Sequence, residues 1–344
     1  MLKAHPKLSS IDGASKQLPM LSAVVPTFNE SANIDVLIER LIGVFNDLAI
    51  PFEIICVDDG SSDDTALRIS EWHRRHEGIK LVRFSRNFGK EAALNAGLAH
   101  SSGDAVIQLD ADLQHPPEII KTFFKKWQDG SEIVYGKRKS RQKESLLRRF
   151  MAKAFYRVFA AVSNVKLMEG LGDFILLDRK VVDALLALPE RERFTKGLYA
   201  WVGFKREAVP FEVAERAGGQ SGFNYRRLFH FAMDAITAFG SMPLKIWSVI
   251  GFMMAASAMT FGAFIVLQKL IFGIDVPGYP SLMAALCFFA GVQLIGLGIV
   301  GEYLSRVLME VKQRPLYLVQ ERVGFEEDEE RHYVGPLPLE RVAS

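Results

Sequence analysis

The stretch Ala105-Val-Ile-Gln-Leu-Asp-Ala-Asp-Leu-Gln114 joins a short apolar run, residues 105–109, to two aspartates that are one residue apart, Asp110 and Asp112. An apolar run of this length that ends in polar residues is typical of a buried β-strand followed by a loop. Two carboxylates at the C-terminal end of a strand can hold a hard divalent cation against a diphosphate. The stretch therefore predicts a strand and a metal-binding loop.

Further short apolar runs alternate with amphipathic helical patterns on both sides of this stretch. The runs are residues 21–25, 52–57, 79–84 and 132–135. Such a βαβ alternation implies a mainly parallel sheet covered by helices. We therefore expect an α/β domain whose ligand lies beyond the carboxyl ends of the strands.

Polar residues follow each of the first four predicted strands. They are residues 26–30 (PTFNE), 58–62 (DDGSS), 85–90 (SRNFGK) and 110–112 (DAD). Asp and Ser are also common helix N-caps, which is the alternative explanation for Ser61 or Asp63 taken singly. Polar residues at four strand ends together favour a ligand site.

Two long uncharged stretches, residues 246–268 and 281–301, follow in the second half of the chain. At about 1.5 Å per residue, each is long enough to cross a hydrocarbon core of roughly 30 Å. The alternative is a pair of buried core helices, but neither stretch has the polar stripe that a globular helix keeps toward water. The short connection at residues 272–280 is rich in Pro and Gly, so we expect a transmembrane hairpin.

Basic residues flank the outer ends of this hairpin, and the connecting loop has none. They are Arg226, Arg227, Lys245, Arg306, Lys312 and Arg314. The positive-inside rule therefore predicts that both termini and nearly all of the polar chain are cytoplasmic. Residues 1–19 contain no continuous apolar core of a secretory signal, so we expect a flexible leader there.

We expect the chain to divide into five parts. They are a leader (1–19), an α/β domain (20–224), an amphipathic interfacial helix (225–243), the transmembrane hairpin (244–304) and a cytoplasmic C-terminal segment with an acidic tail (305–344). Residues 146–159 show a second basic amphipathic pattern. Helices of this kind lie at the membrane interface, where basic groups meet lipid phosphates; the alternative is two core-packed helices with solvated arginines.

Three motifs resemble a known family in order and spacing: VVPTFNE (24–30), VDDGSSDDT (57–65) and DADLQHPPE (110–118). They resemble the family 2 glycosyltransferases of GT-A fold, specifically the dolichol-phosphate mannose synthase and bactoprenol glucosyltransferase group. The resemblance covers roughly residues 20–320, since polyprenyl-phosphate members of the group also carry a C-terminal transmembrane hairpin. It implies a GT-A (Rossmann-like) domain with a mainly parallel sheet.

The resemblance implies a Mg²⁺ or Mn²⁺ ion bound by Asp110, Asp112 and Gln114, and hard oxygen ligands suit these ions. It also implies a set of nucleotide-binding residues, which are Pro26, Phe28, Glu30, Asp58, Lys90, Asp110 and Ala111. From the residues alone, Phe28 remains open as core filling and Lys90 as a surface lysine. Asp59 remains open as either a nucleotide contact or a turn residue.

The resemblance further implies that Asp112, Asp173 and Arg138 are catalytic. Arg138 would stabilise the negative charge that develops on the departing nucleoside diphosphate. Asp173 lies in a Gly-Asp-Phe segment whose carboxylate is usually described as a catalytic base. A lipid monophosphate has a second pKa of about 6 and is largely ionised near pH 7, so we expect Asp173 to orient the sugar or the acceptor instead.

Arg148, Arg149 and Arg216 are the candidates for binding the acceptor phosphate. Arg148 and Arg149 lie in the basic pattern at residues 146–159. Arg216 resembles a family arginine on the acceptor loop, but Gly222-Phe-Asn follows where some members have Lys-Tyr. This departure leaves the contacts of the loop open.

The expected function is transfer of one sugar, glucose or a related hexose, from a UDP-sugar to a polyprenyl phosphate such as undecaprenyl phosphate, with inversion, at the bacterial inner membrane. One alternative is a GDP-mannose-dependent polyprenyl-phosphate mannose synthase. A processive polysaccharide synthase fits poorly, because the chain has no Gln-x-x-Arg-Trp motif. A third alternative is a non-catalytic sugar-nucleotide-binding partner of a flippase.

The expected partners are the nucleotide-sugar donor, the lipid acceptor and the membrane. The formal net charge of +2 gives no reason to expect a nucleic acid. Glycines in both apolar stretches allow close helix approach, which suggests a homo-oligomer, and the resemblance makes a tetramer one such form.

Overall fold

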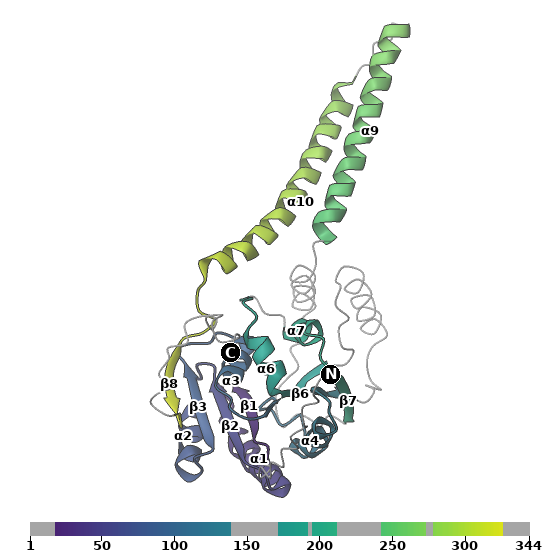
Figure 1. Cartoon of the computed structure of the whole chain (residues 1–344). Helices are drawn as coiled ribbons and strands as arrows, with labels where there is room; N and C mark the ends of the chain where they lie inside the picture. The colour runs from purple at the N-terminus through teal and green to yellow at the C-terminus, as the bar shows by residue number, and fades with distance from the viewer. Residues whose placement is uncertain (1–17, 139–170, 192–194, 212–241, 273–277, 326–344) are drawn as a thin grey trace, which may run out of the picture.

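The computed structural model describes residues 18–138, 171–191, 195–211, 242–272 and 278–325. These residues form a sheet domain from which two long helices project together in one direction (Figure 1).

The domain is built on one eight-stranded sheet in the order β7-β5-β6-β4-β1-β2-β3-β8. The strands are β1 (Leu21–Thr27), β2 (Phe52–Asp58), β3 (Ile79–Phe84), β4 (Ala105–Gln108), β5 (Ile133–Arg138), β6 (Leu171–Asp178), β7 (Arg206–Phe211) and β8 (Val319–Val323). The five strands predicted from apolar runs correspond to β1 to β5, so the prediction of an α/β domain is confirmed.

The centre of the sheet is parallel because β1 pairs in parallel with both β2 and β4, and β2 pairs in parallel with β3. These strands are buried on both faces, and this explains why their sequences are nearly continuous apolar runs rather than alternating ones. Successive side chains point to opposite faces. For example, Ala23 and Val25 pack on one face of β1, whereas Val24 packs on the other.

Helices cover both faces of the sheet (Figure 1). Three pack on one face: α1 (Ile34–Leu48), α2 (Thr65–Arg75) and α4 (Ile120–Gln128), which follows the short 3₁₀ turn η1 (Pro117–Ile119). Three pack on the other: α3 (Lys90–Ala99), α6 (Arg179–Leu186) and α7 (Thr195–Trp201). Because β1 to β4 run in parallel, the loops at their carboxyl ends lie at one common edge of the sheet.

Three strands were not predicted from the sequence. Two of them pair antiparallel: β6 lies between β4 and β5, and β8 pairs with β3 at the edge of the sheet. The third, β7, pairs in parallel with β5. The sheet is therefore mainly parallel at its centre and mixed toward its edges.

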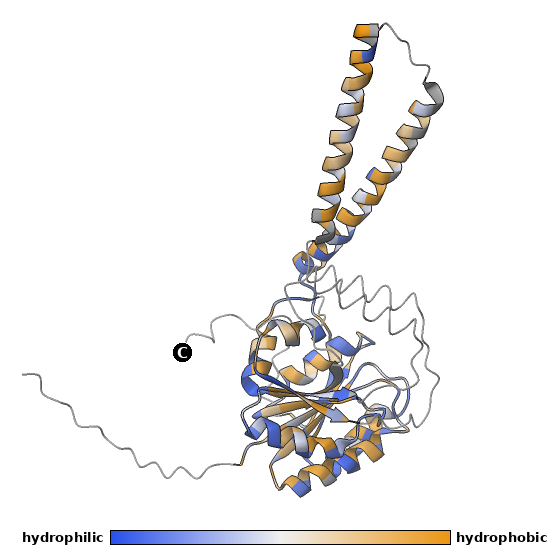
Figure 2. Cartoon of the chain, turned by 90° about the vertical axis from the view of Figure 1, so that its right-hand side faces the viewer, coloured by the Kyte–Doolittle hydropathy of each residue, from blue (hydrophilic) through white to orange (hydrophobic). Residues whose placement is uncertain are grey.

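The two projecting helices are α9 (Met242–Phe272) and α10 (Tyr279–Lys312). They contain candidate membrane spans at Ile246–Gln268 and Ser281–Lys312, with mean hydropathy of 2.0 and 2.2. In the most apolar 18 residues of each helix, only 0% and 6% of the residues are buried, so the alternative of two buried core helices is wrong. Figure 2 shows the apolar character along both helices, away from the sheet domain.

After α10 the chain returns to the sheet domain (Figure 1). Tyr317 is buried and its ring stacks on that of Phe84, with the ring centres 4.7 Å apart. The strand β8 then follows along β3. The C-terminal part, which was expected to be a cytoplasmic segment, thus contributes a strand to the sheet domain.

Candidate active site at the carboxyl edge of the sheet

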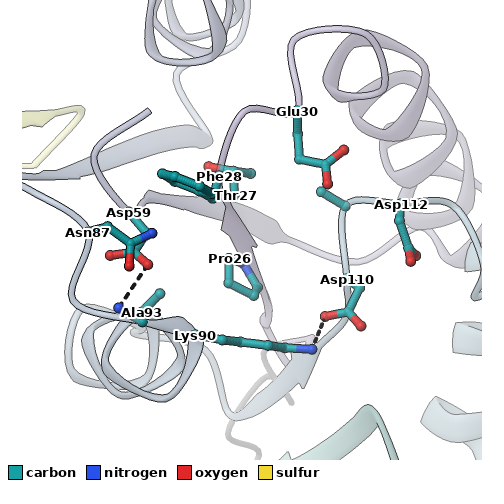
Figure 3. A pocket seen from close by; sticks show the side chains of 12 residues that line it. Pro26, Thr27, Phe28, Glu30, Asp59, Asn87, Lys90, Ala93, Asp110 and Asp112 are labelled. Carbon is teal, nitrogen blue, oxygen red and sulfur yellow. Dashed lines mark hydrogen bonds and ion pairs between the residues drawn. The ribbon is translucent and has the colours of Figure 1, made fainter. Parts of the chain in front are cut away.

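A cavity of about 450 Å³ opens at the carboxyl edge of the parallel strands, where the loops after β1, β2, β3 and β4 meet (Figure 3). It is lined by Pro26, Thr27, Phe28, Glu30, Asp59, Asn87, Gly89, Lys90, Ala93, Asp110, Ala111 and Asp112. Six of the seven residues predicted to bind the nucleotide line it, and the seventh, Asp58, does not. The cavity is large enough for a small polar ligand.

The loop after β1 places Phe28 and Glu30 at the cavity. Phe28 is 47% exposed, so it is not core filling. Asn29 adopts a left-handed backbone conformation with φ of 55°. Its side-chain oxygen Oδ1 accepts a hydrogen bond from the Ser62 N–H at 2.9 Å. Its backbone N–H donates a hydrogen bond to the Ser61 hydroxyl at 2.9 Å. These bonds fix the β1–α1 loop against the β2–α2 loop.

Asp58 ends β2 with its side chain fully buried beside the sheet. Its Oδ2 lies 3.4 Å from Arg83 Nε on the neighbouring strand, and its Oδ1 accepts a hydrogen bond from the Ser61 N–H at 3.2 Å. Burial raises the pKa of Asp58, against the lowering effects of Ser61 and Arg83. In this structure Asp58 supports the loop that borders the cavity.

Asp59 is the aspartate of this pair that reaches the cavity. Its carboxylate accepts hydrogen bonds from the N–H groups of Phe88 and Gly89 at 2.6 and 2.9 Å. Burial raises its pKa, and these two bonds oppose the rise. Asp59 therefore fixes the loop before Lys90 in addition to lining the cavity.

Lys90 is the first residue of α3, and its ammonium reaches across the cavity to Asp110 (Figure 3). The distance from Lys90 Nζ to Asp110 Oδ1 is 2.5 Å. The side chain of Lys90 is 42% exposed and that of Asp110 is 22% exposed. Lys90 is thus an exposed lysine that lines the cavity, with its charge beside the carboxylate of Asp110.

Asp110, Asp112 and His115 form a cluster whose potential ligand atoms all lie within 4.8 Å of one another. The turn that brings them together contains Leu113 in a left-handed conformation with φ of 59°, and Asp112 Oδ1 accepts a hydrogen bond from the Gln114 N–H at 3.1 Å. Carboxylate oxygens suit Mg²⁺ and Mn²⁺, and an imidazole is acceptable to Mn²⁺. The residues present therefore fit a divalent cation.

His115 was not among the predicted site residues. It is buried, and its ring packs against Phe174 of β6 and Phe211 of β7 at centroid distances of 5.4 and 5.6 Å. Its place one residue after Gln114 in the same motif was the signal that could have identified it. Gln114, the predicted third ligand, contributes its backbone N–H to the turn.

The remaining predicted residues fall partly or wholly outside the described structure. Arg138 ends β5 and Asp173 lies in β6, but the description of these two residues is limited to the backbone. Since Gln108 pairs with Ile175, the start of β6 lies beside the end of β4 that leads to Asp110. Arg148, Arg149 and Arg216, with both basic amphipathic patterns, lie outside the described residues.

Residues 22–186 match the family model described as glycosyl transferase family 2. An uncharacterized glycosyltransferase of a Synechocystis strain is 47% identical, over 94% of this chain and 98% of that protein. A prophage-derived bactoprenol glucosyl transferase of Shigella flexneri is 42% identical over 87% of this chain and 97% of that protein. A prophage bactoprenol glucosyl transferase homolog of Escherichia coli is 41% identical over 87% and 98%.

Among solved structures, a glucosyl-3-phosphoglycerate synthase from Mycobacterium tuberculosis, in complex with Mn²⁺, UDP and phosphoglyceric acid, aligns with a TM-score of 0.46 and 20% identity over 64% of this chain and 76% of that chain. The sequence relatives are more similar and match 94% and 87% of this chain. Since they match this chain over nearly their whole lengths, the chain is a glycosyltransferase that belongs to glycosyl transferase family 2.

Proposed function

We propose that this glycosyltransferase moves one sugar from a UDP-sugar to a polyprenyl phosphate and forms a lipid-linked monosaccharide. The observation that carries the proposal is the combination, in one chain, of the carboxylate-lined cavity with two exposed apolar helices long enough to cross a membrane. Relatives named bactoprenol glucosyl transferases support both the lipid acceptor and glucose as the sugar.

In the proposed site, Asp110 and Asp112 hold a divalent cation, with His115 or Gln114 completing the protein ligands. When bound, this cation would neutralise charge on the diphosphate of the donor. The spacing of the Asp110, Asp112 and His115 ligand atoms, all within 4.8 Å of one another, supports the assignment.

Phe28 and Glu30 on one side of the cavity and Asp59 on the other are proposed to bind the nucleoside. The exposed ring of Phe28 offers an apolar face to the base or ribose, while the carboxylates can accept hydrogen bonds from their polar groups. Asp58 remains a proposed nucleotide-binding residue, acting through the loop that it supports.

For the reaction we propose attack by an acceptor phosphate oxygen on the anomeric carbon from the face opposite the leaving group. The new bond joins carbon to phosphate oxygen, the bond from carbon to the diphosphate breaks, and UDP leaves with the electron pair. Lys90 and Arg138 stabilise the charge that develops on UDP. Asp173 orients the sugar or the acceptor, since the ionised phosphate needs no base.

The acceptor side is proposed to face the membrane. The hairpin anchors the catalytic domain at the cytoplasmic face of the bacterial inner membrane, and Arg148, Arg149 and Arg216 bind the lipid phosphate. Cysteine accessibility in intact cells tests this topology. A reagent confined to the outside should label a cysteine placed in the loop at residues 273–277 and should leave a cysteine at Ser62 unlabelled.

A homo-oligomer, with a tetramer as one form, is proposed for the hairpin. Among the six glycines of α9 and α10, Gly296 lies close to the Trp247 ring. An ideal Cβ would meet no atom of this chain within 4 Å at the other five, which are Gly251, Gly262, Gly291, Gly298 and Gly301. Such open positions allow a second helix to approach closely. Mass measurement in detergent would reject the oligomer if only a monomer were found.

The deciding experiment incubates the purified chain with undecaprenyl phosphate, Mn²⁺ or Mg²⁺ and a panel of UDP- and GDP-sugars, and follows sugar in the lipid extract. UDP-glucose should yield a lipid-linked sugar. Selective use of GDP-mannose would instead support the mannose synthase alternative. Binding of donor with no metal-dependent release of UDP would support the non-catalytic partner, and the absence of lipid-linked product with every donor would overturn the proposal.

A further inference from the structure

The segment that follows the membrane hairpin, residues 316–323, packs against the end of β3, next to the loop that lines the donor cavity. We call it the return segment. Tyr317 is 4% exposed, and its ring is nearly parallel to that of Phe84, with 4.7 Å between centroids and 14° between planes. The Leu318 carbonyl accepts a hydrogen bond from the Ser85 N–H at 3.0 Å. Both contacts fall where β3 ends.

The end of β3 leads directly into a loop, residues 85–89, that lines the cavity through Asn87 and Gly89. On its opposite side this loop is held by Asp59, which accepts hydrogen bonds from two of its N–H groups. It also packs closely against Gly60, where an ideal Cβ would lie 2.6 Å from the backbone carbonyl carbon of Arg86. The loop is therefore fixed between the β2–α2 turn and the return segment.

Charged side chains also connect the return segment to β3 and β2. In the pairing register Asp58 of β2 lies opposite Arg83 of β3, and Arg83 lies opposite Glu321 of β8. The distances are 3.4 Å from Arg83 Nε to Asp58 Oδ2 and 3.9 Å from Arg83 Nη1 to Glu321 Oε2. The carboxylate from the return segment thus shares a guanidinium with the buried aspartate that holds the β2–α2 turn.

We propose that the return segment is a positioning element of the donor site, with Tyr317 as its principal residue. By holding the end of β3, it sets loop 85–89 and, through that loop, the position of Lys90 at the start of α3. The inference rests on the proposed function, in which the cavity binds a nucleotide sugar. If the inference holds, the donor site is fully positioned only when the return segment, which follows the hairpin in the sequence, is packed against β3.

The test measures binding of UDP in the presence of Mn²⁺ to the purified full-length chain in detergent, by calorimetry. Tyr317→Ala should raise the Kd about ten-fold, since small displacements of positioning groups have effects of this order or larger. Tyr317→Phe keeps the ring stack and should bind UDP like the wild type. If Tyr317→Ala does not fold, Tyr317→Leu replaces it, because leucine keeps buried apolar volume without the ring. Tyr317→Leu should also raise the Kd for UDP.

The chain offers a matched control in the stacked pair Phe45 and Phe52, whose ring centres are 4.8 Å apart with 17° between planes. Phe52 begins β2, at the edge of the sheet opposite the cavity. Phe52→Ala should lower the melting temperature as Tyr317→Ala does and leave the Kd for UDP unchanged. In turnover, Tyr317→Ala should raise KM for the donor and leave KM for the lipid acceptor at the wild-type value.

Wild-type affinity for UDP in Tyr317→Ala and Tyr317→Leu, or an equal loss in Phe52→Ala, would overturn the positioning role and leave the proposed function intact. If the wild-type chain itself bound no UDP with Mn²⁺, the proposed UDP donor and the positioning role would both be wrong. A ten-fold loss confined to the Tyr317 variants that lack the ring supports the inference.

Discussion

The ammonium of Lys90 lies 2.5 Å from an Asp110 carboxylate oxygen, on the cavity wall formed by the loops after β3 and β4. This contact places a fixed positive charge within the carboxylate cluster. A diphosphate bound in the cavity would bring further negative charge to the same position, where a lysine is a strong point-charge partner.

Lys90→Met should therefore lower kcat/KM for the donor by about 10²-fold, in the range found for loss of one charged or hydrogen-bonding group near a developing negative charge. Steady-state rates with undecaprenyl phosphate and UDP-glucose give the comparison. Lys125→Met, at an exposed lysine in the last turn of α4, is the control and should keep wild-type rates. Equal rates for the two variants would show that Lys90 does not act on the donor.

Transfer activity should depend on a divalent metal ion bound by the cluster of Asp110, Asp112 and His115. Asp112→Asn removes one anionic ligand and should lower activity about 10²-fold or more, because the cation neutralises diphosphate charge directly. Chelation with EDTA should abolish wild-type turnover, and added Mn²⁺ should restore it. The exposed Asp129, at the C-terminal end of α4, gives the control variant Asp129→Asn. Full activity in EDTA would contradict the metal assignment.

The hairpin and the central strands could be predicted because each has a strong local signal. Uninterrupted apolar length identifies the hairpin, and short apolar runs identify β1 to β4. The position of the cavity followed from a general property of parallel sheets, that loops at the carboxyl ends meet at one edge.

The return strand β8 could not be predicted, because its sequence, VQERV, is mostly polar and none of its residues is fully buried. Its strand conformation depends on pairing with β3, which is more than 200 residues away in the sequence, and strand preference is set largely by such context. The sequence also could not show that Asp59 lines the cavity whereas Asp58 is buried near Arg83. Neighbouring residues of an extended chain point to opposite sides, and the sequence does not show which side faces the cavity.

The hydrogen bonds of Asp63 predict a pH dependence of stability. Burial raises its pKa, but hydrogen bonds from Thr65 and Ser31 outweigh this effect and lower the pKa from 3.8 to about 2. The folded pKa is thus below the unfolded value. Ionised Asp63 therefore stabilises the folded state above about pH 4, and this contribution is lost as the pH falls toward 2.

Asp63→Asn should lower the melting temperature at about pH 5, and the difference from the wild type should shrink as the pH falls toward 2. Thermal unfolding in detergent across this range measures the effect. Asp64→Asn is the neighbouring control, since Asp64 is exposed and its side chain makes no capping hydrogen bond to α2. A difference for Asp63→Asn that stays constant over the whole range would contradict the depressed pKa.

Two helical glycines, one packed tightly and one with open space beside it, should respond in opposite ways to substitution by alanine. The tightly packed one is Gly97, which lies in α3 against β1. An ideal Cβ on Gly97 would lie 2.1 Å from Cγ1 of Val24, a fully buried side chain that is stiff at χ1. Gly97→Ala should therefore destabilise the domain by about 1–3 kcal/mol through overpacking. It should also disturb the strand that leads to Pro26 and Phe28, and so weaken donor binding.

Gly43 lies within α1, and an ideal Cβ there would meet nothing within 4 Å. Gly43→Ala should stabilise the chain by about 0.5–1 kcal/mol, because alanine loses less backbone entropy than glycine when a helix forms. Chemical denaturation of the two variants separates the effects. Stabilisation by both substitutions would contradict the overpacking, because it would mean that α3 can move away from β1 at little cost.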